Sequence, residues 1–457
     1  MDALQIAQTA RAASLLLQAA PTDLKNRALL YIHAALKDRK AEILAANHLD
    51  LQNAKAQVDH GTLSSSLFKR LDLAGINDAK YDALLQGVLD IIQLDDPVGK
   101  VTLANQLDHG LNLYRVSCPV GVALIIFEAR PEVVVQISTL ILKSGNAVIL
   151  KGGKEADASN RALVDCIHAA LTKLASENNS GFTVPVGAVQ LVSSRSAVDD
   201  LLKMDGLIDL VIPRGGSALV KHVRESTRIP VLSHAAGICS IYVDTESDAK
   251  MAADVAVDSK TDYPAACNSA ETLIINSNVL NTHLPEISQA LLARGVQLRC
   301  DERSFALLRS ISACQPLIIA STPTDYDTEF LELIMAVKVV DHLDEAIHHI
   351  NTHGSKHTDV VITSNKDTAT QFMSRIDSGA VYWNASTRFT DGFRYGFGAE
   401  IGVSTNKTHV RGPVGLDGLM IYRYRIYGNG HTVAPYNTGE KVYHRQAIPT
   451  AEAQERI

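Results

Sequence analysis

Residues 121–150, GVALIIFEARPEVVVQISTLILKSGNAVIL, decide the fold. The run Gly121 to Phe127 is apolar without alternation, which is typical of a strand buried on both faces of a parallel sheet. Pro131 then opens a helix that we expect to end before Gly145, because proline favours the first helical turn and glycine the position after the last. A second apolar run, Ala147 to Leu150, follows. The stretch therefore predicts a strand–helix–strand unit.

The same alternation of elements continues along the chain and predicts a doubly wound α/β domain. A second α/β segment begins near Cys239 and runs to about Val403. The further elements that we expect in the first domain are a helix over 158–174, a strand over 189–192, a helix over 197–204, a strand over 207–212 and a helix over 217–224.

The two ends of the chain differ from these α/β segments. Residues 1 to about 95 show apolar positions at helical spacing, so this part is expected to be helical. Two alternating segments over 101–107 and 111–117 predict a hairpin. After Gly412 we expect one strand, Leu419 to Tyr427, and then an irregular polar tail.

The composition is that of a soluble globular protein. The chain has 457 residues, 46% of them hydrophobic and 20% charged, with a net charge of −7. This charge disfavours general binding to nucleic acid or a membrane surface. No signal peptide or apolar run of membrane-spanning length is visible, so we expect a cytoplasmic protein.

Cysteine and histidine spacing gives no sign of a disulfide framework or a metal site. The six cysteines are widely spaced without a Cys-x-x-Cys pair, which favours reduced thiols. The tandem His348-His349 lies on a predicted helix without matching ligands, and we interpret it as exposed surface. The cysteines are at positions 118, 166, 239, 267, 300 and 314.

One of these thiols has the setting of a nucleophile. Cys267 lies in the segment Tyr263-Pro264-Ala265-Ala266-Cys267-Asn268, between a predicted helix and an apolar strand, Thr272 to Ile275. A reactive thiolate needs access to substrate and nearby donors or positive charge, and its own backbone N–H could help to form an oxyanion hole. A small buried residue before a strand would fit the same local sequence, which does not decide between the two.

Two glycine-containing loops follow predicted parallel strands. Lys151-Gly-Gly-Lys154 and Arg214-Gly215-Gly-Ser217 are both expected at the carboxyl edge of one sheet, where ligands of such sheets bind. A helix that starts near Ser217 could offer free N–H groups to a phosphate. Neither loop has a dinucleotide fingerprint or a P-loop, and each could also be an ordinary turn.

Several side chains could bind an anionic substrate. Arg130 stands between a predicted strand and helix, where it could bind a phosphate or carboxylate, or pair with Glu128. The segment Val381 to Phe389 contains the only tryptophan, together with Asn384, Ser386 and Arg388. Together with Cys267, these residues suggest thiol chemistry on a polar, anionic substrate.

The order of motifs resembles the γ-glutamyl phosphate reductase family of the aldehyde dehydrogenase superfamily. The resemblance covers most of the chain. It rests on Phe127-Glu-Ala-Arg-Pro131, Lys143-Ser-Gly-Asn146, Lys151-Gly-Gly-Lys-Glu155, Asp262-Tyr-Pro-Ala-Ala-Cys-Asn268, Tyr382-Trp-Asn-Ala-Ser-Thr-Arg-Phe389, Gly396-Phe-Gly-Ala-Glu-Ile-Gly402 and Arg411-Gly-Pro-Val-Gly-Leu416.

The resemblance implies an aldehyde-dehydrogenase-like α/β fold with three parts. These are a Rossmann-type NADP-binding domain (1–98 and 118–238), an α/β catalytic domain (239–404), and a small β arm for oligomerisation (99–117 and 405–457). It also implies NADPH-dependent reduction of L-glutamyl 5-phosphate to L-glutamate 5-semialdehyde, the second step of proline biosynthesis from glutamate. Cys267 would form a thioester, and phosphate would leave.

The resemblance also implies roles for single residues. Lys151 would contact the adenosine ribose and Glu329 the nicotinamide ribose, while the loop with Gly215 and Ser217 would lie near the pyrophosphate. Lys154 would suit the 2′-phosphate of NADPH. Cys267 and Asn268 are the expected catalytic residues, and Arg130, Asn384, Ser386 and Arg388 the expected substrate contacts; no metal is expected.

The match also shows two departures from hydrolytic aldehyde dehydrogenases. Those enzymes have a glutamate base where this chain has His234-Ala-Ala-Gly237, and an oxyanion asparagine where it has Ala129. A reductase that exchanges its acyl group with phosphate does not need the glutamate. The side chain of Asn268 or Asn384 could replace the asparagine.

Alternatives and partners follow from the same reasoning. A hydrolytic or CoA-acylating dehydrogenase is the main alternative, and a non-catalytic binding protein with the same fold is another. We expect a homo-oligomer, dimer or higher. Because acyl phosphates are labile, a transient complex with glutamate 5-kinase is a further expectation.

Overall fold

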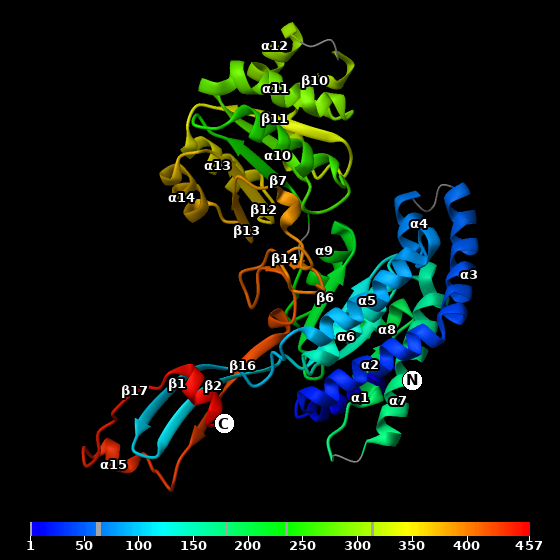
Figure 1. Cartoon of the computed structure of the whole chain (residues 1–457), viewed down its shortest axis with the longest axis vertical. Coiled ribbons are helices and arrows are strands. Elements are labelled where there is room, and N and C mark those ends of the chain that lie inside the picture. Colours follow the sequence, from blue (N-terminus) through cyan, green and yellow to red (C-terminus); the bar gives the residue numbers. More distant parts are fainter. Residues whose placement is uncertain (1, 61–64, 179–180, 234–235, 312–314) are drawn as a thin grey trace.

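The computed structural model describes residues 2–60, 65–178, 181–233, 236–311 and 315–457. They form two α/β units and an extended β arm (Figure 1). The predicted α/β class is confirmed, since each unit contains a sheet in which every strand pairing is parallel.

The first sheet has four strands in the order β5-β4-β3-β6. Its centre is the strand–helix–strand unit expected from residues 121–150, and every residue of β3 is buried. Helices α1 and α6 pack against β4, and α7 packs against β5. The strands are β3 (Val122–Phe127), β4 (Ala147–Lys151), β5 (Val189–Leu191) and β6 (Leu210–Arg214); the helices between and after them are α6 (Glu132–Lys143), α7 (Asp157–Glu177), α8 (Arg195–Leu201) and α9 (Ser217–Ser226).

The N-terminal helices belong to the same unit. They pack on one another, on α6 and α7, and on the strands of the first sheet. Helices α1, α2, α3 and α5 share one hydrophobic core with that sheet, while Leu71 of α4 lies in a smaller cluster. These helices are α1 (Ala3–Leu17), α2 (Thr22–Asp38), α3 (Lys40–Asp59), α4 (Ser65–Leu71) and α5 (Ala79–Gln93).

The second sheet has seven strands in the order β10-β9-β11-β8-β7-β12-β13. Side chains on one face form a core with α10, α11 and α12, and those on the other face form a core with α13 and α14. The elements are β7 (Cys239–Val243), α10 (Ala249–Thr261), β8 (Ala270–Asn276), α11 (Leu280–Ala293), β9 (Gln297–Cys300), α12 (Glu302–Ile311), β10 (Ile318–Ala320), β11 (Ile334–Val340), α13 (Leu343–His353), β12 (Thr358–Ile362), α14 (Lys366–Arg375) and β13 (Ala380–Trp383).

The arm projects from the lower end of the molecule in Figure 1. The expected hairpin is present as β1 (Val101–Asp108) and β2 (Leu111–Pro119), and β16 (Met420–Tyr427) pairs antiparallel with β2. Expecting an irregular tail was wrong. Strand β17 (Gln446–Ala447) pairs with β1, and the short helices α15 (Ala434–Asn437) and α16 (Thr450–Glu455) also lie in the tail.

A short antiparallel pair links the arm to the rest of the chain. It consists of β14 (Val403–Ser404) and β15 (Gly412–Pro413). None of the helices in the described residues combines the length and apolar character of a membrane-spanning segment.

Candidate functional site

Cys267 lies in a short loop between α10 and β8. In the all-parallel second sheet this places it at the amino edge, where the strands begin. The Cys267 side chain is partly exposed, whereas Cys118, Cys166, Cys239 and Cys300 are buried. Burial raises the pKa of the Cys300 thiol to about 12 and that of Cys166 to about 11. Among these five thiols, Cys267 is therefore the one with access to a substrate.

The backbone of Cys267 packs closely against Gly237 and Cys239. A Cβ built on Gly237 would lie 2.6 Å from the Cα of Cys267, so this position has no room for a side chain. The buried Cys239 Sγ donates to the Cys267 carbonyl oxygen at 3.4 Å. These contacts fix the position of the Cys267 backbone at the amino edge of the sheet. Of the motif that contains Gly237, His234 and Ala235 lie outside the described residues.

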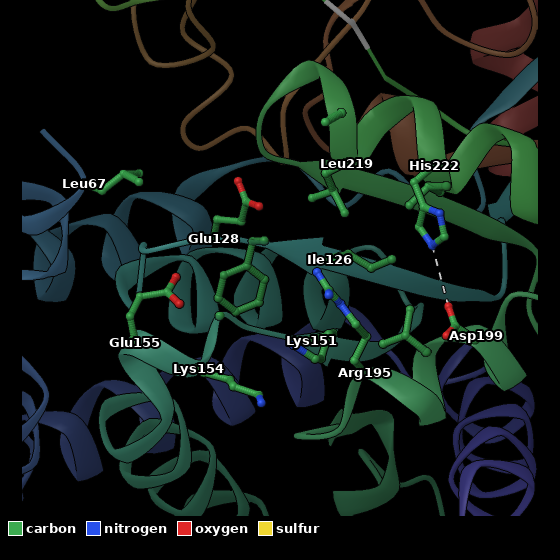
Figure 2. A pocket seen from close by; sticks show the side chains of 15 residues that line it. Leu67, Ile126, Glu128, Lys151, Lys154, Glu155, Arg195, Asp199, Leu219 and His222 are labelled. Atoms are coloured by element: carbon green, nitrogen blue, oxygen red, sulfur yellow. Dashed lines mark ion pairs between the residues drawn. The ribbon is translucent and has the colours of Figure 1, made fainter. Parts of the chain in front are cut away.

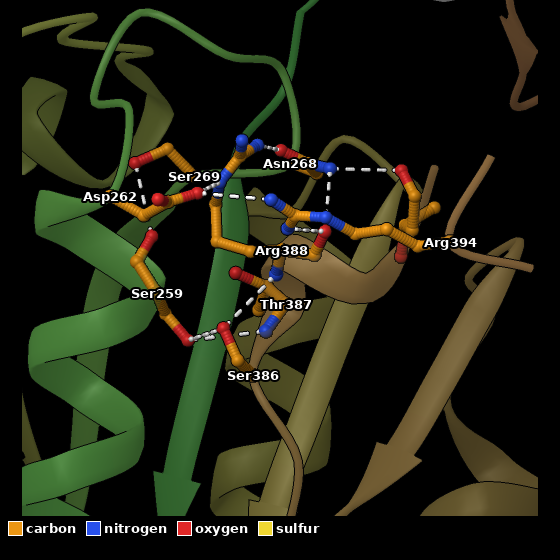
Figure 3. A network of polar contacts seen from close by, with 9 residues as sticks. Ser259, Asp262, Asn268, Ser269, Ser386, Thr387, Arg388 and Arg394 are labelled. Atoms are coloured by element: carbon orange, nitrogen blue, oxygen red, sulfur yellow. Dashed lines mark hydrogen bonds and ion pairs between the residues drawn. The ribbon is translucent and has the colours of Figure 1, made fainter. Parts of the chain in front are cut away.

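A network of polar contacts also holds the loop at Asp262 and Asn268 (Figure 3). The guanidinium of Arg388 donates from Nε to Asp262 at 3.1 Å and from Nη1 to Oδ1 of Asn268. Arg394 also donates to Asp262, at 3.2 Å. Hydrogen bonds from Arg388 and then Arg394 hold the pKa of Asp262 below its ordinary value. Arg388 thus connects the residues on both sides of Cys267.

The side chain of Asn268 is committed to this network. Its Nδ2 donates to the carbonyl oxygen of Thr390 at 2.8 Å, while its Oδ1 accepts from Arg388. The side chain is buried. Nδ2 also donates to the carbonyl oxygen of Arg388 at 3.4 Å, so in this arrangement the amide positions the loop.

Ser386 is buried beneath the same loop. Its Oγ lies 3.1 Å from Oγ of Ser259 on α10 and accepts from the N–H of Arg388 at 3.2 Å. Ser259 Oγ in turn accepts from the N–H of Thr387 at 3.1 Å. These contacts fasten the segment after β13 to α10 and so support the Arg388 network.

Asn384 lies elsewhere. It follows the last residue of β13, so it stands at the carboxyl edge of the sheet, opposite to Cys267. Its Oδ1 accepts from the N–H of Thr363 and its Nδ2 donates to the Thr363 carbonyl, both at 2.9 Å. A five-residue strand such as β12 spans roughly 16 Å. The structure therefore does not bring Asn384 to the thiol.

Glu329 is on the same edge as Cys267, in the segment that precedes β11. This segment is tied to β8, because the N–H of Leu331 donates to Oε1 of Glu271 at 3.5 Å. Glu271 also forms an ion pair with Lys260, with 2.6 Å between Nζ and Oε2 and both side chains fully buried. The pair lies between the Cys267 loop and the Glu329 segment.

A cavity of about 810 Å³ opens at the carboxyl edge of the first sheet (Figure 2). Lys151 at the end of β4 lines it, as do Lys154 and the exposed Arg195 at the start of α8. Burial lowers the pKa of Lys151, and the neighbouring cations Arg195 and Lys154 lower it further, whereas Glu155 raises it. Val198 and Leu219 add apolar surface. The acidic residues Glu128, Glu155 and Asp199 line it as well, and the cavity has the size of a site for a small molecule.

The second glycine loop borders this cavity. Gly215 packs against Glu128, whose carboxylate would lie 2.5 Å from a Cβ at that position. The same carboxylate accepts from the N–H of Gly216 at 3.3 Å. Helix α9 begins at Ser217. The side chain of Ser217 lies outside the described part of the structure. The loop thus has the expected backbone placement, with Glu128 as an acidic neighbour.

Two arginines, Arg130 after β3 and Arg214 at the end of β6, stand at the carboxyl edge of the first sheet. Burial lowers the pKa of Arg130, and the nearby cations Arg214 and Arg70 lower it further. Arg130 is also close enough to Tyr263, in the Cys267 segment, to interact with it electrostatically. Such a pair of neighbouring cations is typical of a site for a phosphate or carboxylate.

Glu400 lies in the same region. Burial raises its pKa, the Arg214 cation opposes this shift, and a charge on Cys267 would add to it. Its Oε2 accepts from the N–H of Gly392 at 2.8 Å, and the Arg214 guanidinium donates to the carbonyl oxygen of Ile401. The segment around Glu400 therefore connects Arg214 with the surroundings of the thiol.

Curated relatives match nearly the full chain. A probable gamma-glutamyl phosphate reductase of Schizosaccharomyces pombe is 52% identical over 424 residues, which are 93% of this chain and 92% of the relative. The gamma-glutamyl phosphate reductase of Saccharomyces cerevisiae is 46% identical over 442 residues, covering 94% of each. The chain belongs to the gamma-glutamyl phosphate reductase family.

Solved structures agree with the family. The gamma-glutamyl phosphate reductase of Thermotoga maritima has a TM-score of 0.87 at 38% identity, covering 94% of this chain and all of that one. An acetylating aldehyde dehydrogenase from Geobacillus thermoglucosidasius has a TM-score of 0.62 at 16% identity, covering 94% and 97%, which shows a shared fold alone. No protein-family model matches the chain. The chain therefore has an aldehyde-dehydrogenase-like fold, and as a member of the gamma-glutamyl phosphate reductase family it is an oxidoreductase.

Within this reductase, the sequence patterns missed three residues near the candidate site. Arg195 follows β5 in Ser193-Ser194-Arg195, and its position after a strand could have identified it. Arg214 was part of a quoted loop but had been assigned no role. Gly237 could not have been identified, because its close approach to Cys267 is a tertiary contact.

Proposed function

We propose that this enzyme reduces L-glutamyl 5-phosphate to L-glutamate 5-semialdehyde with NADPH and releases phosphate, as the second step of proline biosynthesis from glutamate. The observation that carries the proposal is the accessible thiol of Cys267, whose loop is held by Gly237 and by the Arg388 network. The names of the full-length relatives support the same reaction.

In this proposal Cys267 is the nucleophile. The Sγ thiolate attacks the acyl carbon of the acyl phosphate, a carbon–sulfur bond forms, and the carbon–oxygen bond to phosphate breaks. The leaving phosphate carries away the electron pair of that bond. The proton of the Cys267 thiol has passed to solvent before the attack, when the thiolate forms. NADPH, when bound, supplies the hydride that reduces the thioester carbon. Departure of the Cys267 thiolate from that carbon then releases the aldehyde.

The chain's own residues determine where NADPH would bind. Lys151, Lys154 and Arg195 line the cavity of the first sheet and would attract the nucleotide phosphates, including a 2′-phosphate. The N-terminus of α9, with Gly215 and Ser217, would face the pyrophosphate. Glu329, on the same edge of the second sheet as Cys267, would bind the nicotinamide ribose.

The substrate's anionic groups would be bound from both units. Arg130 and Arg214 stand at the carboxyl edge of the first sheet and their charges interact, and we assign the substrate phosphate to them. Arg388 and Ser386 act by positioning the Cys267 loop, as does Asn268. Asn384, whose amide is bonded to Thr363 at the opposite edge, is left out of the site.

The arm supports a homo-oligomer. Side chains of β16 expose a strip of large apolar and aromatic groups, among them Tyr422, Tyr424 and Ile426. Such a surface on a projecting edge strand is suited to covering by a second copy of the chain. A transient complex with glutamate 5-kinase would shield the labile acyl phosphate from water. The widely spaced cysteines, without a Cys-x-x-Cys pair, favour a reducing, cytoplasmic compartment.

The reverse reaction tests the proposal. The enzyme is given glutamate 5-semialdehyde and NADP⁺, with and without phosphate, and formation of NADPH is followed. We expect turnover that requires phosphate and disappears in Cys267→Ala. Turnover that is indifferent to phosphate would instead indicate a hydrolytic dehydrogenase, and activity that survives the substitution would remove Cys267 from the mechanism.

A further inference from the structure

The buried ion pair of Lys260 and Glu271 takes no part in the thiol chemistry described above. Lys260 lies in the last turn of α10 and Glu271 is the second residue of β8, and both side chains are fully buried. Well-packed apolar residues of similar volume are often at least as stabilising as a buried ion pair. The position of this pair, between the Cys267 loop and the segment with Glu329, therefore calls for an explanation other than stability.

Glu271 uses its two carboxylate oxygens on two different elements. Its Oε2 accepts from Nζ of Lys260 at 2.6 Å, and its Oε1 accepts from the backbone N–H of Leu331 at 3.5 Å. Leu331 follows Glu329 by two residues, in the segment that leads into β11. An apolar residue in place of Glu271 could fill the same volume, but it could not bind this N–H. The pair therefore couples α10 and β8 to the Glu329 segment.

The backbone at Leu331 needs such support. Its φ angle is +59°, in the left-handed region that a bulky apolar residue rarely adopts. A residue other than glycine stays in that region only where its surroundings hold it there, and such residues cluster at functional sites. Leu331 is 45% exposed, so burial of its side chain does not supply this hold. The hydrogen bond to the buried Glu271 carboxylate is a contact that can.

The preceding residue, Phe330, is held from another strand. The Arg299 guanidinium, on β9, lies 4.9 Å from the ring centroid of Phe330. In the order of the sheet, β11 lies between β9 and β8. Phe330 and Leu331 are thus anchored to the two strands that flank β11, and Glu329 is the residue immediately before them. The place of the Glu329 carboxylate is therefore set by contacts from both neighbouring strands.

We propose that Lys260 and Glu271 are positioning residues for the nicotinamide half of the cofactor. Glu271 fixes the backbone of Leu331 and through it the Glu329 carboxylate, while Lys260 holds Glu271 in the orientation that reaches Leu331. Glu329 is also close enough to both members of the pair to interact with their charges. The inference rests on the proposed function, in which Glu329 binds the nicotinamide ribose.

Two double variants separate positioning from packing. Lys260→Met/Glu271→Leu, the acceptor-free variant, removes the ion pair together with the acceptor for the Leu331 N–H. Lys260→Met/Glu271→Gln, the acceptor-retaining variant, removes both charges but keeps a side-chain carbonyl for that N–H. Neither leaves an unpaired charge in the core, so we expect both to fold, and circular dichroism checks this. Glu329→Ala is the reference for complete loss of the ribose contact.

Binding to the full-length enzyme is measured by isothermal titration calorimetry with two ligands and no substrate. NADPH contains the nicotinamide ribose, whereas adenosine 2′,5′-bisphosphate represents only the adenosine half with its 2′-phosphate. We expect the acceptor-free variant to bind NADPH about tenfold more weakly than wild type, as Glu329→Ala does, because a charge-assisted hydrogen bond to the ribose is lost. It should bind the bisphosphate as wild type does. The acceptor-retaining variant should keep most of the wild-type affinity for NADPH.

A purely structural role of the pair predicts other results. An equal loss of affinity for NADPH and for the bisphosphate would overturn the inference, as would an unchanged NADPH affinity in the acceptor-free variant. An equal loss in both double variants would also overturn it. Unchanged NADPH binding in Glu329→Ala would remove Glu329 from the proposed cofactor site, and this inference with it. Because the titrations need no turnover, failure of the proposed reductase reaction would leave their result intact.

Discussion

Removing the charge of Lys260 should destabilise the catalytic unit strongly. Lys260 and Glu271 are both fully buried, with 2.6 Å between Nζ and Oε2. The substitution Lys260→Met keeps the length of the aliphatic stem and leaves Glu271 buried without this partner. Deleting one member of a buried ion pair costs about 3–5 kcal/mol, because the remaining charge is uncompensated.

The environment of the pair agrees with a large loss. Burial raises the pKa of Glu271 to about 7, although the charge and hydrogen bond of Lys260 act in the opposite direction. Burial also lowers the pKa of Lys260, and the charge of Glu271 opposes this shift. Each partner therefore stabilises the charged form of the other, and removing Lys260 removes the contribution that opposes the burial of Glu271.

The loss of unfolding free energy in Lys260→Met should depend on pH in a defined direction. Without Lys260 the folded-state pKa of Glu271 rises further, so in the interval above the unfolded value the native variant binds more protons than the unfolded chain. Its free energy of unfolding then increases relative to wild type as pH falls. The loss of stability relative to wild type is largest above the raised folded-state pKa of the variant. It shrinks as the pH falls toward about 7, the pKa of Glu271 in wild type, below which Glu271 is protonated in both native proteins.

Urea unfolding followed by circular dichroism, at about pH 8 and about pH 5.5, measures both effects. The double variant Lys260→Met/Glu271→Leu is the matched comparison, and we expect it to regain most of the lost stability, because no unpaired charge remains. A loss below about 1 kcal/mol in the single variant at the higher pH would refute the reasoning. So would a double variant that is no more stable than the single one.

Three further predictions concern activity. Gly237→Ala should lower kcat by more than tenfold without changing NADPH affinity, because a Cβ would displace the Cys267 backbone. Steady-state kinetics measure this effect. Gly206→Ala, which has open space around the added Cβ, is the control and should behave as wild type. Arg388→Met should reduce the rate at which iodoacetamide alkylates Cys267 and should lower kcat by about 10- to 100-fold. The reason is that hydrogen bonds to charged groups contribute about 1.5–3 kcal/mol each. An unchanged alkylation rate would show that the network does not position the loop. Arg195→Ala should raise KM for NADPH by about tenfold and leave KM for NADH nearly unchanged, and an equal effect on both cofactors would exclude a 2′-phosphate contact.

The parts of the fold that the sequence predicted are those with local signals. The apolar strands of residues 121–150, the proline at the helix start and the glycine after the helix end all act within one element, so β3, α6 and β4 were placed correctly. The tail after Tyr427 was missed because its short strand β17 is defined by pairing with β1. Its sequence has no alternation long enough to predict that pairing.

Side-chain neighbours were harder to predict than elements. Arg388 contacts Asn268 in the Cys267 loop, whereas the amide of Asn384, four residues earlier, is bonded to Thr363 beyond the end of β12. The local sequence does not specify which side chains of this segment reach the thiol. The buried state of His349 was missed for a related reason, because the residues that cover it come from separate elements.

The most direct test of the central claim is a single turnover without phosphate. Enzyme at high concentration is mixed with glutamate 5-semialdehyde and NADP⁺, NADPH formation is recorded, and the protein is quenched in acid for mass spectrometry. The account predicts a burst of about one NADPH per active site and a glutamyl adduct on the peptide that contains Cys267, which added phosphate discharges. Continuous turnover without phosphate, or a burst with no adduct on Cys267, would contradict it.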